Sequence, residues 1–269
     1  MPYGAMILAA GRGERMRPLS DTTPKPLLEV GGKPLIVWQI EALARAGFRR
    51  IVINAAHLAD VLVARLGDGA AFDVSIAWSI EPEALETAGG IATALPLLPP
   101  GPALIVSADI HTGFDYATLR PRAEAMALGE TSAALPHGAT SPNGRIPRVH
   151  LVMVPNPPYH PGGDFALLPP AQDAEGDRFG ARIAQDGGTR LTFGNIGLYD
   201  TALFADLPRF TKLKLLPLFN RWIAAGLVSG ERFDGPWSNV GTPADLEQLD
   251  ATLTSATTIA PPGANTIRP

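Results

Sequence analysis

Near its N-terminus the chain reads Leu8-Ala9-Ala10-Gly11-Arg12-Gly13-Glu14-Arg15-Met16-Arg17-Pro18-Leu19, and Pro24-Lys25-Pro26-Leu27 follows after a short gap. The apolar run that ends at Ala10 is typical of a strand buried on both faces, as in a parallel sheet. Gly11 and Gly13 then allow a tight turn that brings backbone N–H groups close to an anion. The same stretch carries the cations Arg12, Arg15, Arg17 and Lys25. Backbone donors and cations together suit a polyphosphate, so we predict a phosphate-binding loop.

Three other interpretations of this loop have to be compared with a phosphate-binding loop. A glycine pair after a strand is more often a plain turn than a ligand site. A dinucleotide-binding loop needs a third glycine, and Met16 stands at that position. A Walker loop needs a Lys-Ser/Thr pair after the second glycine, and none follows. The nicotinamide and Walker interpretations are therefore poor.

What remains is the pattern Gly-x-Gly-x-Arg-Met-x-Pro-Leu, followed by Pro-Lys-Pro-Leu. It resembles the N-terminal motif of the sugar-1-phosphate nucleotidyltransferases, and similar motifs extend the resemblance over roughly residues 3 to 250. The resemblance implies an α/β fold, namely a Rossmann-like nucleotidyltransferase (GT-A-like) three-layer sandwich with a central mixed, mostly parallel sheet. It also implies a reaction that joins a nucleoside triphosphate to a sugar 1-phosphate and releases pyrophosphate.

The length, the net charge and the lack of cysteine exclude several classes of protein. The chain has 269 residues, enough for one large α/β domain or two small ones. Its formal net charge is −4, so no bulk positive field attracts nucleic acid. Because there is no cysteine, disulfides, thiolate catalysis and cysteine-ligated metals are excluded. We find no leader segment and no apolar run of membrane-spanning length, so we expect a cytoplasmic protein without membrane contact.

Strands and helices alternate through the first part of the chain. Helical spacing covers residues 34–47, with proline at the start and glycine at the end. The pattern then predicts a strand at 50–54, a helix at 57–66, a strand at 74–80 and a buried strand at 103–108. This order is typical of βαβ units and a parallel sheet, in which ligands gather at the carboxyl ends of the strands.

The segment Glu81-Pro82-Glu83-Ala84-Leu85-Glu86-Thr87-Ala88-Gly89-Gly90-Ile91 allows two interpretations. It can be a plain loop that enters a helix at Ile91, with Thr87 as the cap. It can also be a nucleobase site, because Gly89 and Gly90 would let a flat ring lie against bare backbone. The resemblance favours the second, since the family binds the base with a Leu-x-Thr-x-Gly segment, and this one looks most like uridylyltransferases acting on N-acetylmuramate 1-phosphate. The residues thus assigned to the nucleotide are Ala10, Gly11, Gly13, Glu86, Gly89 and Gly90.

Asp109 directly follows the buried strand at 103–108 and faces the strand-end cleft. An aspartate in this position is usually a helix cap or a turn former. We favour a metal role, because Mg²⁺ held by one or two carboxylates and by phosphate oxygens lets two phosphorylated substrates approach each other. The family has Asn-Gly-Asp or a similar triplet here. This chain has Ser107-Ala108-Asp109, so the acid is kept and the side-chain amide is lost.

A proline-rich stretch runs from Val154 to Leu167 and is predicted to lie between two strands. Such a loop is often only a stiff connection between strands. Its pattern, Val-x-Asn-Pro-x-x-His-x-x-Gly-Asp-Phe-x-Leu, resembles a segment of the muramate 1-phosphate enzymes that forms part of the wall on the sugar side. The resemblance makes Asp164 a contact to a sugar hydroxyl or amide. His160 has no second histidine or acid at ligand spacing, so we interpret it as a loop or surface histidine.

Two further residues are assigned to the sugar. A strand at 190–199 is broken by glycines, which often mark a ligand or a bulge. The family holds its sugar near this strand, so Asn195 is a candidate sugar contact, with a structural hydrogen bond as the equal alternative. A helix is predicted at 213–225, and a cation at a helix start opposes the dipole. We therefore predict that Lys214 reaches the sugar phosphate, and the alternative is a solvated lysine.

The motif Trp237-Ser238-Asn239-Val240-Gly241-Thr242-Pro243 precedes a helix capped by Thr242, with Pro243 at its first position. It resembles the family's Trp-x-Asp-Val-Gly-Thr-Pro, whose Asp is the second metal ligand. Here that position is Asn239. A neutral amide offers an oxygen but lacks the charge that helps to strip water from Mg²⁺. We therefore predict weaker or single-site metal binding at Asp109 and Asn239.

The domain organisation is predicted to be simple. Residues 1–253 form one nucleotidyltransferase domain, and the small, polar and proline-rich residues 254–269 form a flexible tail. Within the domain we also expect a helix at 114–128, a strand at 131–135 and a flexible loop at 171–178.

The resemblance implies UTP and N-acetyl-α-muramate 1-phosphate as substrates, in cell-wall recycling. Arg15 would neutralise the triphosphate and the leaving pyrophosphate, Lys25 would bridge toward the α-phosphate and Asp109 would carry Mg²⁺. Two alternatives stay open. The first is an enzyme that forms a GDP- or CDP-sugar from a hexose or heptose 1-phosphate, and the second is a non-catalytic regulator that binds nucleotide. We expect a monomer or a small homo-oligomer.

Overall fold

The structure is a computed structural model, and it describes residues 3–131, 147–169 and 180–259. The elements of the first half are β1 (Gly4–Leu8), β2 (Glu29–Val30), β3 (Lys33–Pro34), α1 (Leu35–Arg45), β4 (Arg50–Ala55), α2 (Ala59–Leu66), β5 (Ser75–Ile80), α3 (Glu86–Ala94), β6 (Pro102–Ser107), β7 (Ile110–Thr112) and α4 (Arg120–Thr131). Those of the second half are β8 (Val149–Val154), β9 (Phe165–Leu167), β10 (Ala181–Ala184), β11 (Thr189–Asp200), α6 (Leu216–Ala224), β12 (Val228–Arg232), β13 (Trp237–Asn239) and α7 (Pro243–Ile259). The alternating strands and helices predicted up to β6 are confirmed.

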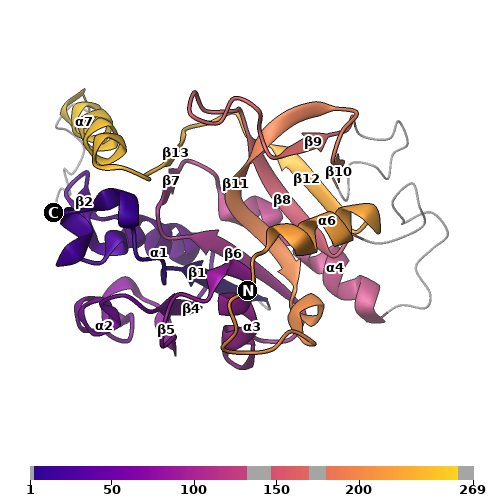
Figure 1. The fold of residues 1–269 in the computed structure, drawn as a ribbon, viewed down its shortest axis with the longest axis horizontal. Helices are drawn as coiled ribbons and strands as arrows, with labels where there is room; N and C mark the ends of the chain where they lie inside the picture. The colour runs from indigo at the N-terminus through magenta and orange to yellow at the C-terminus, as the bar shows by residue number, and fades with distance from the viewer. Residues whose placement is uncertain (1–2, 132–146, 170–179, 260–269) are drawn as a thin grey trace, which may run out of the picture.

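The central sheet is mixed, with the strand order β5-β4-β1-β6-β11-β8-β12-β10-β9 (Figure 1). Strands β5, β4, β1 and β6 run parallel, whereas β11 runs antiparallel to both β6 and β8. Strand β12 is parallel to β8, and β10 and β9 complete the sheet with antiparallel pairings. Because the first four strands point the same way, their carboxyl ends share one edge, where ligands bind in such sheets.

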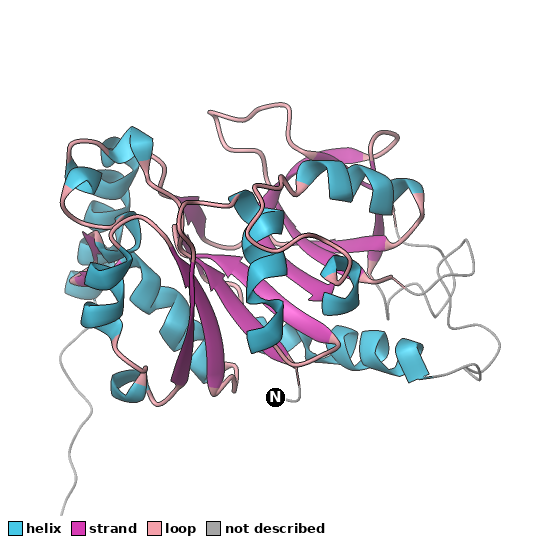
Figure 2. Ribbon diagram, turned by 60° about the horizontal axis from the view of Figure 1, so that its bottom comes forward, coloured by secondary structure: helices cyan, strands magenta, loops and turns pink. Residues whose placement is uncertain are grey.

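Helices cover both faces of this sheet (Figure 2). The side chains of β1 alternate between two cores: Ala5 and Ile7 pack with α1, α2 and α4, whereas Met6 packs with α3 and α6. The alternation arises because successive side chains of a strand point to opposite faces. The predicted three-layer sandwich with a mixed sheet is therefore confirmed.

A third apolar cluster holds the loop after β1 against the C-terminal helix. Met16 is fully buried there and packs with Val240 and Leu249. This packing explains why an apolar side chain stands where a dinucleotide-binding loop carries glycine. Helix α7 begins as predicted, because Thr242 Oγ1 accepts a hydrogen bond from Asp245 N at 3.3 Å while Asp245 Oδ2 accepts one from Thr242 N at 2.8 Å.

The flexible tail predicted at 254–269 begins inside a helix. Helix α7 continues to Ile259, so residues 254–259 are helical rather than part of a flexible tail. The polar composition is misleading here because Ser255 Oγ donates to the carbonyl oxygen of Ala251 at 2.8 Å, one turn back, and so satisfies its hydroxyl within the helix.

Two other predictions are wrong in part or fall on residues outside the described ones. Helix α4 ends at Thr131, so the strand predicted at 131–135 begins inside a helix, and its remainder lies outside the described residues. The loop predicted at 171–178 also lies outside them. Among the helices that the structure describes, none has the length and apolarity needed to cross a membrane.

Candidate active site

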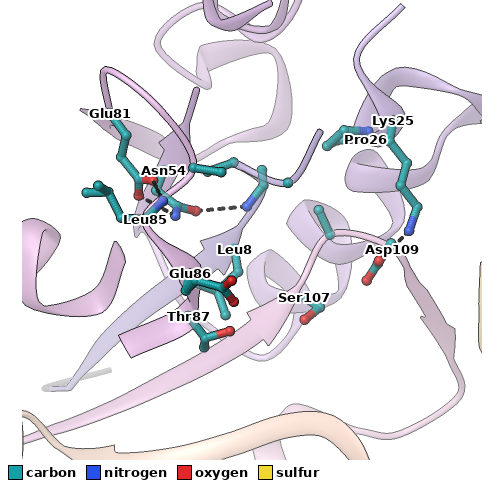
Figure 3. A pocket seen from close by; sticks show the side chains of 15 residues that line it. Leu8, Lys25, Pro26, Asn54, Glu81, Leu85, Glu86, Thr87, Ser107 and Asp109 are labelled. Atoms are coloured by element: carbon teal, nitrogen blue, oxygen red, sulfur yellow. Dashed lines mark hydrogen bonds and ion pairs between the residues drawn. The ribbon is translucent and has the colours of Figure 1, made fainter. Parts of the chain in front are cut away.

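A cavity of about 360 Å³ opens at the carboxyl ends of the parallel strands (Figure 3). Its walls come from the loop after β1, the end of β4, the segment that enters α3 and the turn after β6. Five of the predicted site residues line it together, namely Ala10, Gly11, Lys25, Glu86 and Asp109. The structure thus brings three separate parts of the chain to one place, which we call the strand-end cavity.

The loop from Ala10 to Gly13 presents bare backbone N–H groups. Within the described residues, the amides of Ala10, Gly11, Arg12 and Gly13 donate to no protein acceptor. Gly13 has a φ of 67°, and a Cβ there would lie 3.0 Å from Lys25 Cβ, so glycine is needed on both counts. A Cβ on Gly11 would meet no atom within 4 Å. The fold therefore leaves the space beside Gly11 open for a ligand.

Gly11→Ala is expected to weaken nucleotide binding without a loss of stability. Its Cβ would occupy the open space at the cavity wall, so we expect the free energy of unfolding to stay within about 0.5 kcal/mol of the wild type. Gly13→Ala is the matched contrast and is expected to lose about 1–2 kcal/mol, because its backbone is left-handed. Urea unfolding and calorimetric titration with a nucleoside triphosphate measure the two effects. A Gly11→Ala protein with normal affinity would contradict the assignment of this space to the nucleotide.

Lys25 and Asp109 form an ion pair in the strand-end cavity. Lys25 Nζ lies 2.5 Å from Asp109 Oδ2, although the two residues are 84 positions apart in the chain. Lys25 is only 9% exposed, so its charge is screened less than that of a surface lysine. Asp109 Oδ1 has no partner within the described residues. The site therefore offers a buried cation and an available carboxylate oxygen at one point.

The other cations of the N-terminal stretch divide into two kinds. Arg12 and Arg17 pair with acidic residues of the same stretch at the surface. Arg15 makes no ion pair within the described residues. Burial is the main reason that the pKa of Tyr159 is raised, and the charges of Arg15 and Asp109 both act on this hydroxyl. Arg15 itself lines neither of the cavities described in this section, and its guanidinium lies beside Gly241, two residues after Asn239.

Two buried polar residues that the sequence analysis missed connect the cavity walls (Figure 3). Asn54 accepts a hydrogen bond from Ala9 N at 2.8 Å and donates one to Glu81 Oε1 at 2.7 Å. Glu81 Oε2 accepts from Leu85 N at 3.1 Å, and burial raises the pKa of the Glu81 carboxyl. The network ties the loop after β1 to the segment before α3. The sequence offered one indication of their role, because Asn54 and Glu81 both stand at the ends of predicted parallel strands, where ligands bind.

Gly89 and Gly90 were predicted to present bare backbone to a nucleobase, but the structure does not place them in the cavity wall. Helix α3 begins at Glu86, so both glycines are helical and buried, and Thr87 is not a cap. A Cβ on Gly89 would lie 2.1 Å from the Thr211 carbonyl oxygen, and one on Gly90 would lie close to the polar network. Neither glycine lines the cavity. They are small because other parts of the chain approach them closely.

A second cavity of about 390 Å³ adjoins the first, and we call it the adjoining cavity. Leu8, Thr87 and Ser107 line both cavities, so the two meet at these residues. The other walls of the adjoining cavity come from β11, α6, β13 and the loop at 155–164. Two ligands bound in the two cavities would lie next to each other.

Of the three predicted sugar contacts, Asp164 and Asn195 line the adjoining cavity and Lys214 does not. Asn195 has a φ of 57° and lies where the register of β11 shifts. Strained backbone of this kind gathers at binding sites, and asparagine tolerates it better than most residues. Lys214 is exposed, and α6 begins at Leu216. Lys214 therefore precedes the helix, and the dipole argument for its role was wrong.

Asp109 and Asn239, the predicted metal ligands, lie on neighbouring segments, with Asp109 in the wall of the strand-end cavity and Asn239 in that of the adjoining cavity. Asn239 pairs with Ile110 between β13 and β7, and Val240 N donates to the Asp109 carbonyl oxygen at 2.8 Å. In the described parts of the chain, no group of three or more His, Cys, Asp or Glu side chains could hold a metal ion. One carboxylate and one amide fit a magnesium ion whose remaining ligands are phosphate oxygens and water.

Bare amides and a buried lysine suit the phosphates of a nucleotide, and the adjoining cavity gives a second substrate a place beside them. An arrangement of this kind, at the carboxyl ends of parallel strands, suits a nucleotide-dependent transferase. A model of the nucleotidyl transferase family matches residues 4–146. The chain belongs to this family, as its N-terminal motif predicted.

Two relatives cover nearly the whole chain. An N-acetylmuramate alpha-1-phosphate uridylyltransferase from Neisseria meningitidis is 44% identical over 248 residues, which make up 92% of this chain and 96% of the relative. A relative of the same name from Caulobacter vibrioides is 31% identical over 264 residues, 95% of this chain and 98% of the relative. A solved structure from Bacillus anthracis, assigned as a glucose-1-phosphate thymidylyltransferase, aligns over 97% of both chains with a TM-score of 0.71 and 20% identity. The likeness confirms the Rossmann-like nucleotidyltransferase fold.

Proposed function

We propose that the protein transfers the uridylyl group of UTP to N-acetyl-α-muramate 1-phosphate, which gives the UDP-sugar and pyrophosphate in peptidoglycan recycling. The relatives from Neisseria meningitidis and Caulobacter vibrioides carry the name of this activity. The observation that carries the proposal is the meeting of the two cavities at Leu8, Thr87 and Ser107. UTP on the bare amides and a sugar phosphate in the adjoining cavity would meet there, close to Asp109.

The proposed reaction needs no general base, but it needs positive groups that screen the repulsion between the two phosphorylated substrates. The sugar phosphate is already anionic at neutral pH, so one of its oxygens can attack the α-phosphorus of UTP directly. The bond from this phosphorus to the bridging oxygen breaks, and pyrophosphate leaves with the electron pair. Repulsion between anions and misalignment make up most of the barrier. Lys25 would stabilise charge at the α-phosphate, Arg15 would stabilise the departing pyrophosphate, and the bare amides would hold the remaining oxygens in place.

A magnesium ion would be held by Asp109 and Asn239. When bound, it supplies positive charge that screens the phosphates of the two substrates. Asp109 can serve both cations, because its Oδ2 pairs with Lys25 while its Oδ1 stays available. The pair would orient Asp109 before any substrate arrives, which lowers the reorganisation needed during the reaction.

A matrix of substrates tests the proposed function. The purified protein is incubated with Mg²⁺, one of UTP, GTP, CTP or dTTP, and one of several sugar 1-phosphates, and released pyrophosphate is measured. We expect the highest kcat/KM for UTP with N-acetylmuramate 1-phosphate. Turnover with GTP or CTP and a hexose or heptose 1-phosphate would instead identify the alternative enzyme. Calorimetric binding of a nucleotide without any pyrophosphate release would identify a non-catalytic regulator.

Asn239→Asp is expected to lower the Mg²⁺ concentration that gives half-maximal turnover by about tenfold. The added negative charge strengthens a ligand set that has only one carboxylate in this part of the site. A titration of turnover against Mg²⁺ measures the change, and Asn239→Ala is the matched variant expected to raise the requirement. An unchanged metal requirement in both variants would argue against a metal contact at this position.

A further inference from the structure

The loop at 155–164, which joins β8 to β9, is firmly held at its base. Asn156 Oδ1 accepts a hydrogen bond from Thr192 Oγ1 at 2.9 Å. The guanidinium of Arg190 donates to three carbonyl oxygens of the loop at distances between 2.9 and 3.3 Å. Both anchoring residues belong to β11, so the sheet holds the loop. A tip held in this way loses little conformational entropy when it binds a ligand.

Tyr159 and His160 form the tip of this loop, and both line the adjoining cavity. His160 N donates to the Pro157 carbonyl oxygen at 2.9 Å, and His160 Nε2 lies 3.2 Å from Asp164 Oδ1. Asp164 Oδ2 accepts from Phe193 N at 2.8 Å. Both carboxylate oxygens of Asp164 therefore already serve protein groups. This geometry differs from the expected free contact to a sugar, because the carboxylate orients the imidazole.

The charges on the wall of the adjoining cavity are few. Among the described residues that line it, His160 is the one histidine and no lysine or arginine is present. Asp164 is the one carboxylate in the same set, and it is paired with His160. Asn239 is neutral and forms a hydrogen bond with the Tyr159 hydroxyl. On this described wall, His160 is therefore the one side chain that can carry positive charge toward an acidic substituent, and there is no unpaired carboxylate to repel it.

We propose that His160 recognises the carboxylate of an acidic substituent on the sugar 1-phosphate, and that Asp164 is the residue that positions it. The inference rests on the proposed function, because N-acetylmuramate differs from N-acetylglucosamine only by a lactyl ether that carries a carboxylate. An imidazolium donates a charge-assisted hydrogen bond to a carboxylate, which is stronger than a bond between neutral groups. His160 is thus a specificity-determining residue that selects acidic over neutral sugars.

The test compares His160→Gln with the wild type on two substrates that differ only in the lactyl group. Steady-state kcat and KM are measured with saturating UTP for N-acetylmuramate 1-phosphate and for N-acetylglucosamine 1-phosphate. We expect the ratio of kcat/KM, acidic over neutral, to fall about tenfold, because one charge-assisted hydrogen bond is lost. The fall should lie in the KM of the acidic sugar, since the group contacts the substituent rather than the reacting atoms. His160→Ala is expected to give the same ratio.

Tyr159→Phe is the matched control on the same tip. It removes the hydroxyl that bonds Asn239 and leaves the imidazole in place, so any disturbance of the loop should change both sugars by the same factor. An unchanged ratio in His160→Gln and His160→Ala, or an equal fall of the ratio in Tyr159→Phe, would overturn the role of His160 while uridylyl transfer stands. If the wild type releases no pyrophosphate from UTP with either sugar, the proposed function itself fails.

Discussion

Lys25→Ala is expected to lower turnover by about a hundredfold, the loss typical of one preorganised electrostatic partner. Lys25 is almost fully buried, and its ammonium is held against Asp109 at the cavity where the phosphates would bind. Because few water molecules can replace it, its charge acts strongly on the transition state. Asp109→Ala is expected to lose a similar amount, since it removes the carboxylate that orients Lys25. Pyrophosphate release at saturating substrates measures both changes.

Lys33→Ala is the control for the loss of a lysine from an ion pair. Lys33 pairs with Glu41 and lies over the ring of Trp38, away from the residues that line the two cavities. We expect its turnover to match the wild type, and thermal unfolding should show that all three variants are folded. Near-full activity in Lys25→Ala would be incompatible with a role for this cation at the reacting phosphates.

Gly89→Ala is expected to destabilise the fold by about 3 kcal/mol, which lowers Tm by about 6–12 °C for a chain of this size. A Cβ at this position would lie 2.1 Å from the Thr211 carbonyl oxygen. This neighbour is backbone, and it belongs to a segment already fixed by hydrogen bonds from Ala88 N and Gly89 N to the Leu213 carbonyl oxygen, at 3.0 and 3.2 Å. The overlap can therefore be relieved only by moving α3 or the segment before α6.

Gly113→Ala provides the comparison for Gly89→Ala. A Cβ on Gly113 would approach no atom closer than 3.5 Å, which is an ordinary contact with Pro236. We expect its free energy of unfolding to change by less than about 1 kcal/mol. Equal stability of the two variants, measured by urea unfolding, would show that Gly89 is not kept small by packing and would return it to the candidate nucleotide contacts.

The parts of the fold that could be predicted are those that follow from local patterns. Apolar runs predicted β1 and β6, and the 3.6-residue period with proline and glycine at its ends predicted α1. The start of α7 was also predicted, because Thr242 and Pro243 are typical of the cap and the first position of a helix, and the structure adds Asp245 as the reciprocal partner of Thr242. The end of α7 was not, because its last turns show no apolar period.

The sequence predicted several residues of the candidate site, but it did not predict the contacts between them. Lys25 and Asp109 were each assigned to catalysis, but their direct pairing depends on the order in which β1 and β6 lie in the sheet. The Asn54–Glu81 network was missed for the same reason, since each residue alone looks like an ordinary strand end. The sequence predicts Asp164 as a sugar contact, and only the folded chain shows that its carboxylate lies 3.2 Å from the His160 ring.

Backbone requirements and side-chain alternation act between near neighbours. The order of residues alone therefore predicted the parallel strands, which the structure confirms, and a phosphate-binding loop at their carboxyl ends, which stays a prediction. Close approach between distant segments has no local signature. For this reason only the folded chain could show that Gly89 is small to admit the backbone at Thr211, that Gly11 is small with nothing in the protein beside it, and that two cavities meet at Ser107.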